Sequence, residues 1–463
     1  MDSVSSYIES NRDQFAADLA ELLRIPSISA QAEKNAETRR AGEWVASQFK
    51  NMGLKPEVIP TKGHPLVYAE TPAVPSKPVV LCYGHYDVQP PEPLDEWISP
   101  PFEPTVRDGN IFARGATDDK GQMLTHVKGV EAWIKSVGKL PIQVKFLIEG
   151  EEEVGSQNLE PYVGQNREKL ACNAVVISDC SQFAPGIPAI TYGLRGIAYY
   201  ELKLRGPKQD LHSGTFGGAI TNPANALTTL LAALRDKDGR VQVPGFYDEV
   251  VPLTDREREE YRKLPGTEAE FMQSVGVTGM FGEAGYSAIE RRWARPTFDI
   301  NGLTSGYQGE GAKTVLPAKA SAKFSFRLVP NQDPTKITNG LRKFLEERLP
   351  PGIQMELVDH HGAPGVMVAL ESPYMAAAAA AIESAFGRAP VMIREGGSIP
   401  IVNTFADELG ADVLLLGWGQ NDDNTHSPNE KFSLDDYHRG TLASAALWEQ
   451  IAKLSPTEKS KKK

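Results

Sequence analysis

The sequence predicts an α/β protein in which a mostly parallel sheet, with helices on both faces, is interrupted by an inserted α+β domain with an antiparallel sheet. Two observations favour this class. Apolar strand-like runs alternate with helical patterns towards both ends of the chain, as in parallel sheets covered on both faces. In the middle of the chain, strand-like runs alternate apolar and polar residues, as in an antiparallel sheet with one exposed face.

Before residue 195 the chain supplies the strand and helix alternation of the parallel sheet. A helix is predicted from about Val4 to Leu23, because apolar residues recur at helical spacing and Pro26 ends the pattern. Three apolar runs predict buried strands, and a helical pattern lies between the first two. These elements are the strands at 79–83, 142–148 and 174–178 and the helix at 123–137.

After residue 196 the pattern becomes that of half-exposed strands mixed with helices. They are strands at 197–204, 319–329 and 353–359 and helices at 222–236 and 335–349. The Pro- and Gly-rich segment 360–366 is interpreted as the return to the first sheet, after which alternation resumes up to a last helix at about 435–454. We therefore expect one discontinuous α/β domain, at 1–195 and 364–463, interrupted by an inserted domain at 196–363.

Composition narrows the class of protein. The chain has 463 residues, 41% hydrophobic and 24% charged, as in ordinary globular proteins. Its net charge of −11 argues against a nucleic-acid or membrane-surface partner. No signal peptide and no transmembrane run is visible. The cysteines, Cys82, Cys172 and Cys180, form no disulfide framework and no CxxC zinc pattern, so a reducing, cytoplasmic setting is expected.

Polar clusters follow the predicted strands or the loops between them. They are YGHYDVQP (83–90), ARGATDDKGQ (113–122), IEGEEEVGS (148–156), ISDC (177–180) and NDDNTHSPNE (421–430). Each one alone has an ordinary interpretation as a helix cap, an exposed turn, a His–Asp hydrogen bond or a loop histidine. Together, repelling carboxylates gathered at one sheet edge require a cation. Two imidazoles and three carboxylates without a ligating Cys suit two zinc ions that share one carboxylate, with cobalt or manganese as alternatives.

These motifs, in this order, resemble those of the co-catalytic zinc peptidases and deacylases, a group that includes carboxypeptidase G, aminoacylase, a desuccinylase and the carnosinase-type dipeptidases. The cytosolic non-specific dipeptidase and carnosinase branch is the most similar. The resemblance covers about residues 20–450, and its motifs are HYDVQP, TDDKG, DLHSGTFGG, GAKTVLP, FRLVPN and REGGSIP.

The resemblance implies a role for each matching residue of the metal site. One zinc ion would take His85, Asp118 and Asp179, and the other would take Asp118, Glu153 and His426. Val154 and Gly155 fix the register of the three glutamates, so Glu152 is the general base and Glu151 an extra, solvated acid. Asp87 would orient His85. Asp119 matches the residue that is joined to the bridging Asp118 by a cis peptide bond.

The resemblance also implies a homodimer formed through the inserted domain, which is the family's lid and dimerisation domain. His212 matches a histidine that the partner subunit contributes to hold the oxyanion, although on its local sequence it is equally a solvated loop histidine. Arg327 would grip the substrate carboxylate in two contacts. The other expected substrate contacts, which are equally ordinary loop residues, are Thr314, His361, Glu395 and Ser398.

The implied function is the metal-dependent hydrolysis of dipeptides by a di-zinc-activated water, with two Zn²⁺ per subunit and Mn²⁺ or Co²⁺ as alternatives. An N-acyl-amino-acid amidohydrolase or carboxypeptidase of the same fold remains a second interpretation. An inactive relative used for binding is disfavoured, because Glu152 and every expected ligand are present. The chain contains no GxxxxGK[ST] motif, which argues against a nucleotide-driven ligase.

Overall fold

A computed structural model describes residues 1–397, 399 and 401–456. The chain divides into two compact units. The large unit comprises Met1–Tyr192, Val368–Ile393 and Ile401–Lys463, and the small unit comprises Gly193–Met367 and Arg394–Pro400. The sequence-based domains, 1–195, 196–363 and 364–463, stay a prediction, and the short return of the chain into the small unit at 394–400 was not among the expected features.

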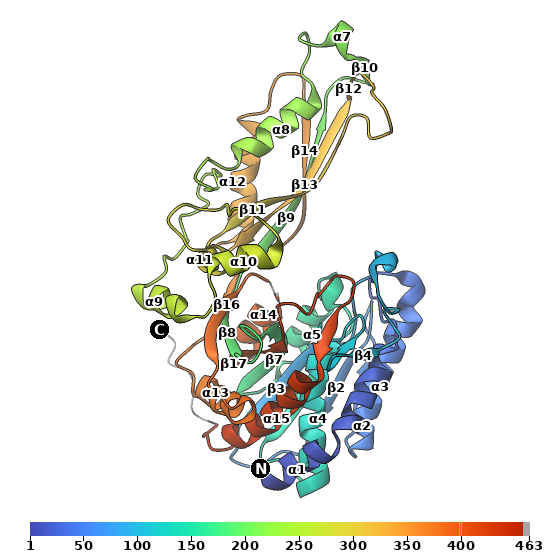
Figure 1. The fold of residues 1–463 in the computed structure, drawn as a ribbon, viewed down its shortest axis with the longest axis vertical. Helices are drawn as coiled ribbons and strands as arrows, with labels where there is room; N and C mark the ends of the chain where they lie inside the picture. Colours follow the sequence, from blue (N-terminus) through green and yellow to red (C-terminus); the bar gives the residue numbers. More distant parts are fainter. Residues whose placement is uncertain (398, 400, 457–463) are drawn as a thin grey trace. The chain divides into compact units, whose positions relative to one another are not determined.

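Parallel strands form the centre of the main sheet, with β6, β3, β7 and β17 in that order (Figure 1). Antiparallel pairs flank them, through β2 and β1 on one side and β8 and β15 on the other. The mixed α/β class with a parallel centre is confirmed, and the antiparallel flanks are an addition to it. The strands are β1 Glu57–Ile59, β2 Leu66–Glu70, β3 Val79–His85, β6 Gln143–Glu149, β7 Ala174–Ser181, β8 Ala189–Leu194, β15 Val366–Met367, β16 Val391–Glu395 and β17 Asp412–Gly419.

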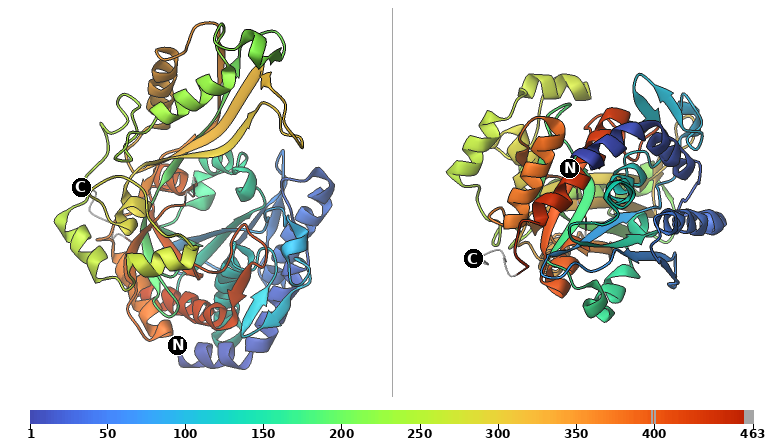
Figure 2. Two further views of the ribbon diagram at one scale, coloured as in Figure 1. Left: turned by 45° about the horizontal axis from the view of Figure 1, so that its top comes forward. Right: turned by 90° about the horizontal axis from the view of Figure 1, so that it is seen from below.

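Helices cover both faces of this sheet. On one face α4 (Lys120–Val137), α13 (Pro373–Phe386) and α15 (Leu434–Ile451) pack together over alternate strand residues such as Val176 and Leu416. Figure 2 shows the ribbon of the helices and the sheet from two further directions. On the other face α14 (Ile401–Leu409) places Phe405 against Tyr83 of β3, with ring centroids 5.4 Å apart. Burial on both faces explains why these strands read as unbroken apolar runs.

The N-terminal segment forms two helices where the sequence predicted one. The chain leaves helical geometry at Asn11, with φ −113° and ψ 13°, while its side-chain amide donates to the Tyr7 carbonyl at 2.7 Å. Asparagine competes for backbone partners in this way, which the apolar spacing does not reveal.

The remaining elements of the large unit are α1 Asp2–Ser10, α2 Arg12–Leu23, α3 Asn35–Asn51, α5 Leu159–Gln165, α6 Arg167–Leu170, the short 3₁₀ helices η1 Ala32–Lys34, η2 Leu94–Glu96 and η3 Glu152–Val154, and a three-stranded sheet of β4 Thr105–Arg107, β5 Asn110–Phe112 and β18 Lys431–Ser433.

The small unit is built on the antiparallel sheet β11-β13-β9-β14. Alternate residues of β9, such as Tyr200 and Leu202, are buried under α8 and α12. A two-stranded sheet of β10 and β12 lies beyond one end of β9 and β13 (Figure 1). The elements are β9 Gly196–Arg205, β10 Leu211–His212, β11 Thr297–Ser305, β12 Val315–Leu316, β13 Lys319–Leu328, β14 Gln354–Ala363, α7 Ser213–Phe216, α8 Pro223–Ala233, α9 Asp255–Lys263, α10 Glu268–Val275, α11 Ala288–Ala294 and α12 Pro334–Glu346.

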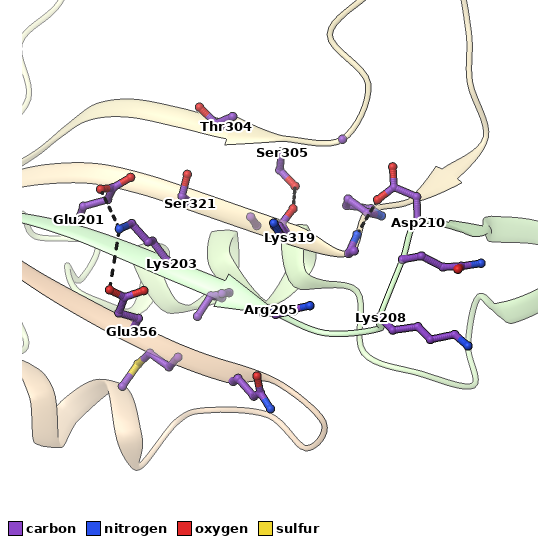
Figure 3. Close-up of a pocket in the computed structure, with 18 residues that line it drawn as sticks. Glu201, Lys203, Arg205, Lys208, Asp210, Thr304, Ser305, Lys319, Ser321 and Glu356 are labelled. Atoms are coloured by element: carbon purple, nitrogen blue, oxygen red, sulfur yellow. Dashed lines mark hydrogen bonds and ion pairs between the residues drawn. The ribbon is translucent and has the colours of Figure 1, made fainter.

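The other face of this small sheet carries charged side chains. Figure 3 shows them along a groove of about 960 Å³, where Lys203 lies 3.6 Å from Glu201 and 3.9 Å from Glu356. The Lys203–Glu356 pair joins the neighbouring strands β9 and β14, so opposite charges on this face lie across from each other. In the described part of the chain, no helix combines the length and the apolar character needed to cross a membrane.

Candidate active site

The end of β3 presents His85, which is fully buried. Its Nδ1 lies 3.1 Å from the Asp87 main-chain carbonyl, to which it donates, and 3.4 Å from the Asp87 carboxylate. This donation fixes the imidazole tautomer and leaves the Nε2 lone pair available as a ligand. The Asp87 carboxylate itself accepts from the main-chain N–H groups of Glu152 and Glu153, at 3.3 and 3.1 Å. Asp87 therefore joins the His85 segment to the glutamate segment.

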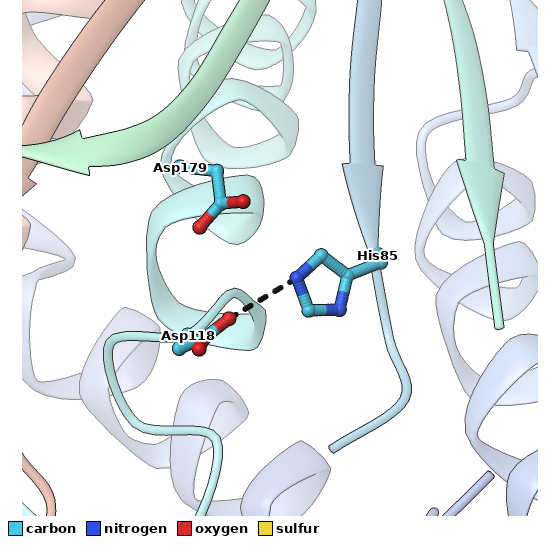
Figure 4. A group of neighbouring side chains, drawn as sticks. All are labelled: His85, Asp118 and Asp179. Carbon is cyan, nitrogen blue, oxygen red and sulfur yellow. Dashed lines mark ion pairs between the residues drawn. The ribbon is translucent and has the colours of Figure 1, made fainter. Parts of the chain in front are cut away.

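Asp118 lies in the loop before α4, and the Asp118–Asp119 peptide bond is cis, as the resemblance implied. Figure 4 shows His85, Asp118 and Asp179 directed towards a common point, with His85 Nε2 3.2 Å from Asp118 Oδ1. Asp179 comes from β7, which pairs with β3 in parallel. Neighbouring parallel strands thus deliver two of the three side chains from the same edge of the sheet.

His426 completes a second group with Asp118 and Glu153. Its Nε2 lies 2.9 Å from Asp118 Oδ2 and 3.3 Å from Glu153 Oε2. His426 has a φ of 61°, in the left-handed region that few non-glycine residues adopt. A bulky residue held in this conformation indicates that the surrounding loop dictates its position.

The prediction of a solvated Glu151 is wrong. Glu151 is buried, and the Asn158 side-chain amide donates to both of its carboxylate oxygens, at 3.1 and 2.8 Å. Glu152 and Glu153 follow in a short 3₁₀ turn, and Gly155 ends that turn with a φ of 93°. The main-chain N–H groups of this turn contact Asp87, and the Glu153 carboxylate faces His426, while Glu151 is buried.

The two groups fit a pair of divalent cations. Each offers one imidazole nitrogen and two carboxylate oxygens whose ligand atoms lie within 4.8 Å of one another, and Asp118 belongs to both. The His85 Nε2 atom is buried and lacks hydrogen-bonding geometry even towards Asp118, although it lies close to it. Nitrogen and carboxylate ligands without a thiolate suit zinc, cobalt or manganese.

The electrostatics of the site follow from imidazoles packed among buried carboxylates. Burial lowers the pKa of His85, but the carboxylates of Asp118 and Asp87 raise it well above its ordinary value. Asp118 and Glu153 raise the pKa of His426 to about 11. Burial raises the pKa of Glu152 to about 8, with added repulsion from neighbouring carboxylates. The field that draws protons onto these groups would equally draw metal cations, since metal binding displaces such protons.

Two supporting residues were not among the predictions. Gln89 donates from Nε2 to Glu153 Oε2 at 2.7 Å, and Glu430 contacts the loop that carries Asp118. Both stand inside motifs that drew attention for other residues. The sequence offers a signal for Gln89 alone: it follows Asp87 by two positions, and residues two apart in an extended segment point to the same side.

His212 and Thr314 are neighbours in the small unit, beyond one end of β9 and β13. His212 on β10 pairs with Val315 of β12, and the Ser213 N–H donates to the Thr314 carbonyl at 3.2 Å. His212 is exposed, and its Nδ1 accepts from the Gly214 N–H at 3.1 Å. The neutral imidazole therefore carries its proton on Nε2, where it is available to donate.

Arg327 and His361 lie near the opposite end of the same sheet. Arg327 on β13 pairs with Ile197, and His361 on β14 pairs with Tyr199, two residues further along β9. The His361 ring stacks on Tyr199 at a centroid distance of 5.5 Å. Burial lowers the pKa of His361, and Arg327 contributes to that shift.

Glu395, at the end of β16, accepts at its main-chain carbonyl from the Arg195 N–H at 3.2 Å. Burial lowers the pKa of Arg195 to about 10, and the positive charge of Arg327 contributes to the shift. Ser398 lies outside the described residues. The structure thus groups Glu395 with Arg327 and His361, apart from His212 and Thr314.

Comparison with known proteins gives one family. A family model described as peptidase family M20/M25/M40 matches residues 81–450. The Cys-Gly metallodipeptidase dug1 of Schizosaccharomyces pombe is 32% identical over 98% of this chain and 99% of its own. The Beta-Ala-His dipeptidase of Homo sapiens is 34% identical over 98% of this chain and 93% of its own. An M20 family metallo-carboxypeptidase of Sulfolobus solfataricus, Sso-CP2, has a similar structure, with 34% identity and a TM-score of 0.86 over 95% of this chain and 99% of its own.

Proposed function

The chain belongs to the peptidase family M20/M25/M40, and on that basis we propose that it is a metal-dependent dipeptidase that hydrolyses the peptide bond of dipeptides. The resemblance seen in the sequence is thereby confirmed at the level of the family. The observation that carries the proposal is the pair of ligand groups that share Asp118. Relatives named as dipeptidases over nearly the whole chain support the choice of substrate.

Glu152 is the proton carrier of the proposed reaction. Two zinc ions, or manganese or cobalt in their place, held by His85, Asp118, Asp179, Glu153 and His426, would polarise the scissile carbonyl and acidify the attacking water. The Glu152 carboxylate takes the proton of that water and then delivers it to the leaving amine. Asp87 holds the Glu152 main chain in place through the N–H contact at 3.3 Å.

The small unit supplies the groups that bind the substrate. The forked guanidinium of Arg327 suits the two oxygens of the peptide carboxylate. His361, Glu395, Ser398 and Thr314 complete the binding set. The Nε2–H of His212 donates to the developing oxyanion, and acceptance of the Gly214 N–H by Nδ1 supports this role because it fixes the tautomer.

The separation of these groups supports a homodimer as part of the proposal. Along β13, Arg327 lies eight positions after Lys319, a span of roughly 26 Å at about 3.3 Å per residue. His212 and Thr314 lie beyond the Lys319 end, whereas a dipeptide extends only about 7 Å. One chain therefore does not bring His212 and Arg327 to the same dipeptide, and the proposed site takes His212 and Thr314 from the small unit of a partner subunit.

Hydrolysis of a plain dipeptide beside its N-acetylated form tests the function. The enzyme is stripped of metal with a chelator, and zinc or manganese is restored. Cleavage of the free dipeptide alone, restored by metal, is expected. Turnover that survives chelation would contradict the metal mechanism.

An N-acyl-amino-acid amidohydrolase or carboxypeptidase is the second candidate, and the similarity to the carboxypeptidase Sso-CP2 favours considering it. Preference for the acetylated compound, or release of the last residue from longer peptides, would identify that activity. A cytoplasmic location is part of the main proposal, because none of the three cysteines, all of which the structure describes, forms a disulfide, as expected in a reducing compartment.

A further inference from the structure

Glu430 is a fully buried carboxylate to which the proposed reaction assigns no role. Its Oε2 accepts from Arg114 Nη1 at 2.8 Å and from the Gly115 N–H at 2.9 Å. Its Oε1 accepts from the N–H groups of Thr117 and Asp118 at 3.0 and 3.2 Å. A carboxylate has about four lone-pair positions, and here the loop that carries Asp118 fills all of them.

The same loop is joined to the His426 segment by further contacts. The Ala113 N–H donates to the Glu430 carbonyl at 3.0 Å. The Thr117 hydroxyl donates to the Lys431 carbonyl at 2.6 Å and lies 2.8 Å from Asp423 Oδ2, a second fully buried carboxylate. Residues 113–118 are thus held by the segment 423–431 rather than by a helix or sheet of their own.

Arg114 extends this connection to a third segment. Its guanidinium is buried, pairs with Glu430, and donates from Nη2 to the Pro90 carbonyl at 3.3 Å. Pro90 belongs to the segment that follows His85 and Asp87. The Glu430–Arg114 pair therefore contacts all three chain segments that carry His85, Asp118 and His426.

We propose that Glu430 is a positioning residue that holds Asp118 between the two metal positions and fixes the distance from Asp118 to His426. This inference rests on the proposed metal centre. Glu430 touches no ligand atom and acts through the main chain of Thr117 and Asp118, so its effect should appear in metal affinity and coordination before it appears in chemistry.

The isosteric change Glu430→Gln breaks this arrangement in a defined way. An amide has one accepting oxygen, and the charged Arg114 holds it more strongly than main-chain N–H groups do. The amide NH₂ then faces the N–H groups of Thr117 and Asp118 and repels them. Glu430 joins the loop 113–118, which carries Asp118, to the segment 423–431, which carries His426. The Asp118–Glu153–His426 group therefore has two of its three candidate ligands on these two segments, whereas the His85–Asp118–Asp179 group has one. The first group should weaken more.

Cobalt titration of the metal-stripped full chain measures this directly. Visible absorption of bound Co²⁺ reports the coordination geometry, and calorimetry reports the two affinities. For Glu430→Gln we expect the ion held by the Asp118–Glu153–His426 group to lose about 10–100-fold in affinity, as is usual when a residue that supports a metal ligand is changed. The absorption band of that ion should change, and the other affinity should move less.

Glu283→Gln is the matched control. Glu283 is also a buried glutamate paired with arginines, accepting from Arg295 at 2.6 and 2.7 Å and from Arg240 at 2.7 Å, but it belongs to the small unit. This change should lower the melting temperature and leave both cobalt affinities as in the wild type. Asp423→Asn, which disturbs the same loop junction more mildly, is the second variant in case Glu430→Gln does not accumulate as folded protein.

The results separate the inference from the function on which it rests. Two wild-type cobalt affinities and an unchanged spectrum in both Glu430→Gln and Asp423→Asn would overturn the role of Glu430. An unchanged Asp423→Asn would do the same if Glu430→Gln is not recovered. A wild-type chain that binds fewer than two cobalt ions would instead overturn the metal centre itself, and the positioning role with it.

Discussion

Two inactive variants of this chain, His212→Asn and Glu152→Gln, should restore activity when their subunits are combined in one dimer. Each substitution alone removes a catalytic contribution. Loss of an oxyanion donor costs about 10²–10³-fold, and loss of a general base about 10²–10⁴-fold. The physical basis is the sheet of the small unit, which separates His212 from Arg327 by more than roughly 26 Å.

The expected magnitude follows from counting sites in a two-fold symmetric dimer. In the mixed dimer, the His212→Asn subunit keeps Glu152 and receives an intact His212 from its partner. The other site lacks both groups. One site of two is therefore functional, and activity should be about 50% of wild type per dimer, far above either parent.

The assay is dipeptide hydrolysis by mixed dimers isolated through two different affinity tags. A matched control places both substitutions on one subunit and pairs it with a wild-type subunit. If His212 acts across the dimer, this control leaves neither site complete and should be almost inactive. If His212 acts within its own chain, the control keeps half of the activity and the first mixed dimer has none. That reversed pattern would refute the shared site.

Three further predictions concern single residues. Glu152→Gln should bind two metal ions and dimerise as the wild type does but lose about 10²–10⁴-fold in kcat; full activity with normal metal content would contradict the proton-carrier role. Arg327→Lys should raise KM for a free dipeptide by roughly 10-fold, because a point charge replaces a two-contact fork, and should have little effect on an amidated dipeptide; equal effects on both would exclude the carboxylate contact. Burial lowers the pKa of His126 to about 3, so the unfolded state binds more protons below the ordinary value of about 6.5. The contribution of His126 to the unfolding free energy should therefore fall by roughly 1.4 kcal/mol per pH unit as pH drops from about 6.5 towards 3. Denaturant titrations at several pH values should show that the unfolding free energy of His126→Gln depends less steeply on pH than that of the wild type.

Where a strand end carries the candidate ligand, the sequence predicted which side chains converge. His85 and Asp179 follow or end apolar runs, and parallel strands deliver their ends to one edge, so their convergence could be expected. The interpretation of Glu151 as solvated rested on the register of the three glutamates, and it failed because a carboxylate that Asn158 satisfies looks identical in sequence to a solvated one. Glu430 was missed for this reason too, since its partners lie more than three hundred positions earlier in the chain.

The fold was predictable where periodicity extends over many residues. The long strands and the helix of α4 carry strong patterns, whereas the short helices α9, α10 and α11 were not assigned. Each of these three begins with a capping box, at Thr254, Thr267 and Ser287, which is a local signal that the sequence does offer. The break at Asn11 depends on a side-chain contact with Tyr7 that apolar spacing does not reveal. The antiparallel pairing of β8 with β17 and β15 depends on contacts between distant segments, which no local pattern records.

The position of β17 has a consequence for biosynthesis. This strand lies between β7 and β8, although the ribosome makes it only after the whole four-stranded sheet of the small unit, which is complete at Ala363. Until β17 emerges, nascent chains expose the unpaired edges of β7 and β8, which are open to chaperones or to aggregation. His426 follows β17, so the proposed Asp118–Glu153–His426 metal group is completed last of all. A chain truncated before residue 412 would keep the edges of β7 and β8 exposed. We therefore expect it to be degraded by proteases rather than to persist as a metal-loaded fragment.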